Sequence, residues 1–252
     1  MKRRLVAAVA CRNQGSRLYG KPLQNLDVRA GIRIIDNILA CLKSIRVIDE
    51  VILGISEGVE NDVFKELATT KGIRYVLGDQ IDVLSRLIQC GELGDATDIF
   101  RVTSESPFLF FDPVDDLWRR HQDEGSDATM MGDVVDGCGF EILSMRALKT
   151  SHAEGDSRHR SELCSLYIRG NPGRFKFTRT AAPPELIRPD LRLTVDNPED
   201  LVVCRRVYQA FKQSAPRISV KDIVKFLDAN PGLISMVAPY TEPARSAPPP
   251  RA

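Results

Sequence analysis

Long apolar runs are missing from this sequence. No uncharged apolar stretch approaches the ~20 residues that a helix needs to cross a bilayer. The first residues, three of them basic, are followed by an apolar run at 5–10, but this run is too short for a secretory signal and Arg12 interrupts it. We therefore expect a soluble protein without a leader peptide and without a role at a membrane.

The sequence also lacks paired cysteines and an excess of one charge. Its cysteines stand singly: Cys11, Cys41, Cys90, Cys138, Cys164 and Cys204. The absence of any C-x-x-C pair argues against a disulfide framework or a zinc site, and favours reduced, mostly buried thiols in a cytoplasmic protein. The formal net charge is +1 at pH 7, so no bulk field would gather nucleic acid.

The first half alternates strand-like and helix-like segments. Residues 5–11 form a continuous apolar run, which is typical of a strand covered on both faces. Further strands are predicted at 50–55, 74–77 and 98–103, and helices at 32–42, 59–70, 81–90 and 113–122. Repeated β-α units of this kind predict an α/β fold with a doubly wound, mostly parallel sheet.

The second half is less regular and predicts a smaller α+β region. Strands are expected at 128–131, 140–143, 175–179 and 192–195, and helices at 145–151, 197–212 and 220–229. From about residue 238 the chain runs through Pro, Ala, Arg and Ser without apolar periodicity, which is typical of disorder. The predicted organisation is one domain, residues 1–237, followed by a disordered tail, residues 238–252.

A basic, glycine-containing loop follows the first strand. Arg12, Arg17 and Lys21 are cationic, and the glycines between them let backbone N–H groups approach a polyanion closely. Loops at the carboxyl ends of the strands are where open α/β sheets bind ligands. The loop matches neither the Walker nor the Rossmann glycine pattern. It is therefore either a cradle for a triphosphate or a solvated turn that happens to be basic.

Two acidic residues stand at the ends of other predicted strands. Glu105 follows the strand at 98–103, and Asp196 ends the one at 192–195. Taken singly, Glu105 suits a surface salt bridge and Asp196 suits a helix cap. If the fold brings them together, they could hold Mg²⁺, which takes a few carboxylate oxygens together with phosphate oxygens.

These segments resemble a known family. Residues 11–23 resemble the A-R-x-x-S-x-R-L-P-G-K-x-L signature of cytidylyltransferases that activate acidic sugars, such as acylneuraminate and Kdo cytidylyltransferases. Four further segments resemble, in order, motifs of the spore-coat polysaccharide type: 78–86 (G-x-x-x-D-V-L-x-R), 99–107 (I-x-R-x-T-x-D-x-P), 161–168 (R-E-H-V-T-x-Y-I) and 192–201 (R-x-T-V-D-x-P-E-D-L). The similarity spans nearly the whole chain and implies a Rossmann-like fold of the nucleotide-diphospho-sugar transferase type.

The resemblance also implies roles for individual residues. The triphosphate of a nucleotide such as CTP would be held by the basic loop, through Arg12, Gly15, Ser16, Arg17 and Lys21. Asp82 and Arg86 would lie near the nucleotide, with Cys11, Ser104 and Glu162 as further substrate-binding candidates. Glu105 and Asp196 would ligate Mg²⁺, and the family's habit of pairing implies a homodimer. The implied reaction transfers CMP to a small anionic acceptor.

The sequence departs from the family pattern where the acceptor would bind. Ser161 and Leu163 replace the motif's arginine and histidine, and position 105 holds glutamate where the family mostly has aspartate. An acidic sugar, a phosphate or phosphonate acceptor, and a degenerate nucleotide-binding protein therefore all remain open. Cations suited to an anionic acceptor are available at Arg158, Arg160, Arg174 and Arg179.

Cys11 and His121 can each be explained by a structural role. Cys11, next to Arg12, is either a thiol with a lowered pKa or a small residue buried at the end of a strand. His121 shows no metal-ligand spacing, and we expect it on the surface of a helix.

Overall fold

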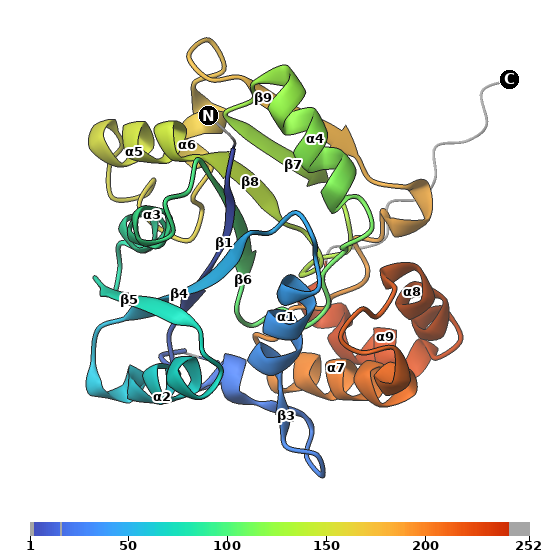
Figure 1. Cartoon of the computed structure of the whole chain (residues 1–252). Coiled ribbons are helices and arrows are strands. Elements are labelled where there is room, and N and C mark those ends of the chain that lie inside the picture. The colour runs from blue at the N-terminus through green and yellow to red at the C-terminus, as the bar shows by residue number, and fades with distance from the viewer. Residues whose placement is uncertain (1–2, 16, 242–252) are drawn as a thin grey trace, which may run out of the picture.

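A seven-stranded sheet forms the centre of the molecule. The computed structural model describes residues 3–15 and 17–241 (Figure 1). The strands are β1 (Leu5–Cys11), β4 (Glu50–Ser56), β5 (Arg74–Gly78), β6 (Asp98–Thr103), β7 (Ala128–Gly132), β8 (Glu141–Ser144) and β9 (Phe177–Ala181), in the order β5-β4-β1-β6-β8-β7-β9. Only β8 runs antiparallel to its neighbours β6 and β7, so the predicted mostly parallel α/β sheet is confirmed.

Helices cover both faces of this sheet. They are α1 (Ile34–Lys43), α2 (Asp62–Thr70), α3 (Val83–Leu93), α4 (Val114–Glu124), α5 (Met145–Glu154), α6 (Leu166–Gly170), α7 (Pro198–Phe211), α8 (Val220–Asp228) and α9 (Pro231–Val237). The strand β1 shows why its sequence is apolar throughout. Leu5 and Ala7 pack into the core beneath α1, α2 and α4, whereas Val6 and Ala8 pack on the opposite face against α3 and α5.

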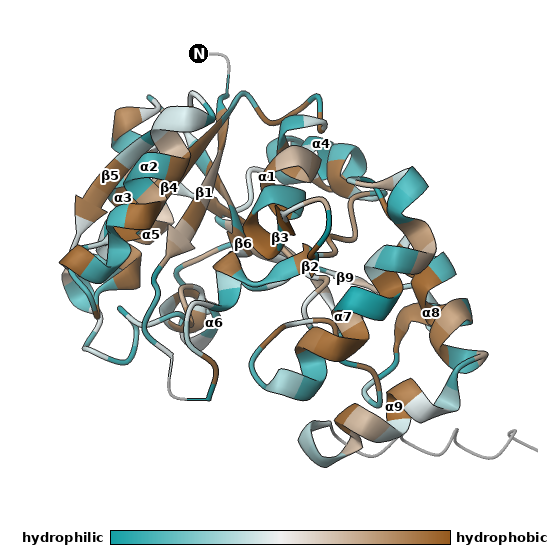
Figure 2. Cartoon of the chain, turned by 90° about the horizontal axis from the view of Figure 1, so that it is seen from below, coloured by the Kyte–Doolittle hydropathy of each residue, from teal (hydrophilic) through white to brown (hydrophobic). Residues whose placement is uncertain are grey.

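The helices α7, α8 and α9 form a separate group at one side of the sheet (Figures 1 and 2). They build their own apolar core. This core includes Leu26 of a short hairpin, β2 (Asn25–Asp27) and β3 (Ile32–Arg33), which the sequence did not predict. In Figure 2 these helices contain both hydrophobic and hydrophilic residues, as expected for helices with one buried face.

The prediction of a strand at residues 192–195 is wrong. Within the described residues, this segment makes only an isolated bridge between Asp136 and Arg192. The N–H of Leu193 donates to the carbonyl of Asp136 (2.8 Å) and that of Val195 donates to the carbonyl of Glu105 (3.1 Å). The segment is apolar because Leu193 and Val195 are fully buried, but its hydrogen bonds go to two different loops instead of one neighbouring strand.

The end of the chain and the cysteines can be compared with their predictions. Residues 238–240 form a 3-10 turn after α9, and the rest of the predicted tail, residues 242–252, lies outside the described residues. All six cysteines are buried and free, as expected. Within the described residues, no helix is long and apolar enough to cross a membrane.

The prediction for His121 is wrong. Its side chain is fully buried, and its Nε2 lies 3.0 Å from Asp98 Oδ1 while its Nδ1 lies 2.8 Å from Thr129 Oγ1. Arg3 also pairs with Asp98. His121 belongs to the buried face of α4 together with Val114, Leu117 and Trp118. There it satisfies a buried carboxylate from another element, and the sequence does not reveal that pairing.

Candidate active site

A pocket of about 640 Å³ opens at the carboxyl ends of β1 and β6. The basic loop, the two acidic residues Glu105 and Asp196, and the segment near residue 162 all contribute to it. Of the residues singled out from sequence, these line the pocket: Arg12, Gly15, Arg17, Lys21, Arg86, Ser104, Glu105, Glu162 and Asp196. Segments that are far apart in the chain therefore meet around one cavity. Ser16, a further candidate, lies outside the described residues.

The basic loop has a tightly folded backbone. The N–H of Gly20 donates to the carbonyl of Asn13 (2.9 Å), and the N–H of Asn13 donates to the fully buried Asn61 (2.8 Å). A Cβ at Gly15 would collide with the carbonyl oxygen of Leu18. The loop is thus anchored to the connection after β4, and position 15 requires glycine.

Asp196 is the centre of a cluster of ion pairs. Lys21 Nζ lies 2.6 Å from its Oδ1 and the Arg17 guanidinium lies 3.3 Å from the same atom, while Arg192 contacts Oδ2. Burial acts to raise the pKa of Asp196, but the hydrogen bond from Lys21 and the charge of Arg192 outweigh it and hold the pKa below its usual value. The carboxylate is therefore ionised at neutral pH.

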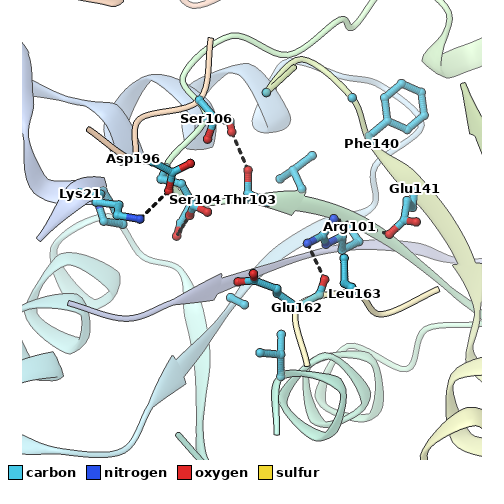
Figure 3. A pocket seen from close by; sticks show the side chains of 18 of the residues that line it. Lys21, Arg101, Thr103, Ser104, Ser106, Phe140, Glu141, Glu162, Leu163 and Asp196 are labelled. Carbon is cyan, nitrogen blue, oxygen red and sulfur yellow. Dashed lines mark hydrogen bonds and ion pairs between the residues drawn. The ribbon is translucent and has the colours of Figure 1, made fainter. Parts of the chain in front are cut away.

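Glu105 lies beside Asp196 because their backbones are joined. The Val195–Glu105 hydrogen bond described above fixes the residue before Asp196 against Glu105. The Ser104 hydroxyl donates to Glu105 Oε2 at 3.2 Å. Glu105 and Asp196, from distant parts of the chain, thus both line the pocket. Figure 3 shows Asp196 next to Lys21 and Ser104.

A third acid in this part of the pocket was not singled out from sequence. Asp136 accepts a hydrogen bond from Arg192 (2.8 Å), and Arg192 also lies 3.2 Å from the buried Asp200. Burial raises the pKa of Asp136, and neighbouring Asp196 adds to this against the opposing charge of Arg192. The loop before β8 carries no motif that marks Asp136, because its position depends on Arg192, 56 residues further on.

Arg86 and its neighbours play a different part. Its guanidinium is almost fully buried and donates to the carbonyls of Gly54 (2.9 Å) and Cys11 (3.3 Å), which joins the ends of β4 and β1. Cys11 and Asp82 do not line the pocket. Burial raises the pKa of the Cys11 thiol, so it is a packed residue. Asp82 caps α3 through the N–H of Ser85 and contacts His152.

Arg101 and Glu141 lie at the other end of the pocket, away from Asp196 (Figure 3). Arg101 Nη1 lies 3.6 Å from Glu141 Oε2, and Arg101 Nη2 donates to the carbonyl of Glu162 at 2.9 Å. Arg169 of α6 also lines the pocket. None of these three side chains had a predicted role.

The arginines that the sequence suggested for an acceptor lie elsewhere. None of Arg158, Arg160, Arg174 and Arg179 lines the pocket. Arg158 pairs with Asp156, Arg174 with Glu154 and Arg179 with Asp133. Each of these pairings satisfies the cation at the surface, so the prediction that they face the acceptor is wrong for this pocket.

The geometry defines a cavity suited to a polyanion. Its lining contains seven cationic side chains, Arg12, Arg17, Lys21, Arg86, Arg101, Arg169 and Arg192, against five acids, Glu105, Asp136, Glu141, Glu162 and Asp196. A basic loop after the first strand of the sheet thus faces acidic residues from distant segments across one cavity.

Comparisons with known proteins support this assignment of the fold. A cytidylyltransferase from Leptospira borgpetersenii matches with a TM-score of 0.80 at 20% identity, over 93% of this chain and 97% of its own. A CMP:2-keto-3-deoxy-manno-octonic acid synthetase complexed with CTP matches with a TM-score of 0.62 at 15% identity, over 82% of this chain and 99% of its own.

Sequence comparison gives a related result. The spore coat polysaccharide biosynthesis protein SpsF of Bacillus subtilis is 26% identical over 184 residues, which are 73% of this chain and 76% of that protein. No protein-family model matches the chain. The resemblance to cytidylyltransferases that the motifs indicated is thus confirmed in the fold.

Proposed function

We propose that the protein is a magnesium-dependent nucleotidyltransferase that transfers CMP from CTP to an oxygen of an acidic sugar or a related small anion. The observation that carries this proposal is the meeting of Lys21 and Arg17 with Asp196 beside Glu105 in one pocket. The similarity to a synthetase complexed with CTP supports CTP as the nucleotide.

The reaction asks for positioning and charge neutralisation. An acceptor oxygen attacks the α-phosphorus, a new P–O bond forms, and the bond to the β-phosphate breaks with release of pyrophosphate. Arg12, Arg17 and Lys21 would bind the triphosphate and stabilise the negative charge that develops on the pyrophosphate. The anchored backbone of the basic loop would keep these cations in place as the charge moves.

Glu105 and Asp196 fit a magnesium ion. Mg²⁺ commonly takes one or two protein carboxylates and completes its shell with water and phosphate oxygens. Both acids line the pocket, and the described residues contain no group of three or more His, Cys, Asp or Glu side chains arranged for a metal. When bound there, Mg²⁺ would neutralise phosphate charge. It would compete with Lys21 for Asp196, which frees the ammonium for a phosphate oxygen.

The acceptor and the assembly are further parts of the proposal. The departures at Ser161 and Leu163 favour testing phosphates and phosphonates beside acidic sugars. A homodimer is expected from the resemblance, and light scattering of the purified protein tests it.

The function is tested by measuring pyrophosphate release. The protein is incubated with magnesium and each of the four ribonucleoside triphosphates, together with a panel of acidic sugars, sugar phosphates and phosphonates. We expect release with CTP and at least one acceptor, and none without acceptor. Tight CTP binding in calorimetry without release from the whole panel would instead identify a nucleotide-binding protein without turnover.

A further inference from the structure

Arg101 and Glu141 face each other across neighbouring strands. They are direct partners in the antiparallel pairing of β6 and β8, and their side chains are 21% and 10% exposed. On β6, Arg101, Val102 and Thr103 all line the pocket, and Val102 also packs in the core that contains the buried residues of α1. The charged pair therefore forms part of the pocket floor.

The guanidinium of Arg101 is held from several sides. The Glu141 carboxylate lies on one side, and the carbonyl of Glu162 accepts from Nη2 on another. Glu141 is itself fixed by a hydrogen bond from the Ser165 hydroxyl. Arginine carries five N–H donors, so these contacts orient Arg101 and leave donors for a ligand. A cation that is already in place loses little conformational entropy when it binds an anion.

Arg169 is a second cation at this end of the pocket. It stands near the end of α6 and is exposed. Among residues 3–15 and 17–241 no carboxylate lies within 4.0 Å of it, and no hydrogen bond engages its side chain. The neighbouring arginines Arg174 and Arg179, by contrast, are paired with acids. Arg169 is thus a pocket-lining cation whose charge is available to a ligand.

Arg101 lies away from the ion pairs around Asp196, although the charge of Glu105 acts on it as well. Figure 3 shows Lys21, Asp196 and Ser104 on one side of Thr103, and Arg101, Glu141 and Leu163 on the other. Leu163, which is 53% exposed, adds an apolar wall. If the triphosphate occupies the basic loop, the second substrate must occupy the remaining end.

We propose that Arg101 and Arg169 bind the anionic group of the acceptor, with Glu141 as the residue that positions Arg101. This inference rests on the proposed function, because it assigns the second end of the same pocket. The recognised chemistry is a carboxylate or a phosphate on a small hydroxylated molecule, placed so that an acceptor oxygen points toward the nucleotide.

The test compares Arg169→Ala and Arg101→Lys with the control Arg179→Ala. Arg179 is 56% exposed and lies outside the pocket. Calorimetry measures binding of 2-keto-3-deoxy-manno-octonic acid, other sugar acids and sugar phosphates to protein saturated with α,β-methylene CTP. We expect Arg169→Ala and Arg101→Lys each to weaken acceptor binding by about 10- to 100-fold, the usual range for a lost charge-assisted hydrogen bond. CTP affinity and the control should change less than about twofold.

The outcomes separate this inference from the proposed function. Acceptor binding at wild-type strength in both variants would overturn it, and so would an equal loss of CTP affinity. The inference also fails if the wild-type protein binds CTP but none of the acids or phosphates. A third outcome is that an acid binds to the wild type and binds more weakly to the variants, while no pyrophosphate is ever released. In that case the proposed acceptor subsite is supported and the transferase proposal fails. Circular dichroism checks that Arg101→Lys remains folded.

Discussion

The ammonium of Lys21 lies 2.6 Å from the carboxylate of Asp196, a residue 175 positions later in the sequence. This contact joins the loop after the first strand to the segment before α7. Because Arg192 and Arg17 approach the same carboxylate, the negative charge of Asp196 holds all three cations at this end of the pocket.

We therefore predict that Asp196→Asn lowers the rate of pyrophosphate release by about 10²-fold or more, since it removes a full charge from the place proposed for the metal. The substitution keeps the size of the side chain, so the melting temperature should stay within a few degrees. Asp123→Asn, on the exposed face of α4, is the control. A near-normal rate in Asp196→Asn would remove this residue from the reaction.

Arg12→Ala should lower the rate by about 10²- to 10³-fold, because a cation near the triphosphate is lost. Arg12 is half exposed, and its one described ion pair is a 3.8 Å contact with Glu162, so folding should be unaffected. Steady-state kinetics at saturating CTP measure the effect. The matched control is Arg119→Ala on α4, which is 71% exposed, and equal effects in the two variants would contradict the assigned role.

Gly15→Ala should weaken CTP binding roughly tenfold or more, because overpacking typically costs about 1–3 kcal/mol. The new methyl group would meet the Leu18 carbonyl and lie 3.3 Å from Lys21 Cε. Gly173→Ala is the control, since a Cβ there meets nothing within 4 Å. Calorimetric titration with CTP compares the two variants. Unchanged CTP affinity in Gly15→Ala would contradict the prediction, because it would show that the loop accommodates the methyl group without moving its cations.

Magnesium removal gives a separate prediction. Excess EDTA should stop pyrophosphate release, and added Mg²⁺ should restore it. The reason is that the proposed reaction needs a metal ion, held by the two acids at this end, to neutralise phosphate charge. Glu105→Gln should raise the magnesium concentration needed for half-maximal rate, while Glu105→Asp should retain turnover. Full activity in EDTA would exclude the metal role for Glu105 and Asp196.

The buried Asp98 predicts how stability depends on pH. Burial acts to raise its pKa, but hydrogen bonds from His121 and Arg3 outweigh it, so the folded-state pKa is lowered. A lowered pKa contributes stability above the unfolded value of about 3.9, and this contribution is lost as the pH falls through the lower folded value. Stability of the wild-type protein should therefore fall on acidification below about pH 4.

Asp98→Asn tests this directly. It leaves Arg3 and His121 without their charged partner, so we expect a loss of about 3 kcal/mol at pH 7 and a shallower decline in acid. Urea unfolding from pH 3 to 7 measures both, with Asp115→Asn on the exposed face of α4 as control. An identical pH profile in Asp98→Asn and the wild type would contradict the prediction.

The parts of the site that depend on strand ends were predictable from sequence. β6 occupies the residues expected for it, and β1 ends where the basic loop begins, so Lys21 and Glu105 were placed at one edge of the sheet. Asp196 was placed there through a strand at 192–195 that the structure does not contain, and it reaches the pocket through the hydrogen bond from Val195 to Glu105. Parallel topology then brings distant segments together without any knowledge of side-chain contacts. Whether these residues hold nucleotide and metal stays a prediction.

The other end of the pocket was not predictable in the same way. Arg101 lies within a recognised motif, but its direction depends on strand alternation and on the pairing of β6 with β8. Arg169 belongs to the five-residue helix α6, which is too short to show a periodic pattern. Asp136 is placed by Arg192 through tertiary contact alone. His121 was missed although its spacing from Val114, Leu117 and Trp118 places it on the buried face of α4, because its partner Asp98 comes from a distant strand.

Glu162 touches both ends of the cavity. Its carboxylate lies 3.8 Å from Arg12 and its carbonyl oxygen accepts from Arg101. A triphosphate that draws Arg12 away would release this side chain. Binding of one proposed substrate should therefore change the affinity for the other through a single residue. Thermodynamic reciprocity then requires that whatever factor CTP applies to acceptor affinity, the acceptor applies to CTP, which makes Glu162 the place where cooperativity between them would be gained or lost.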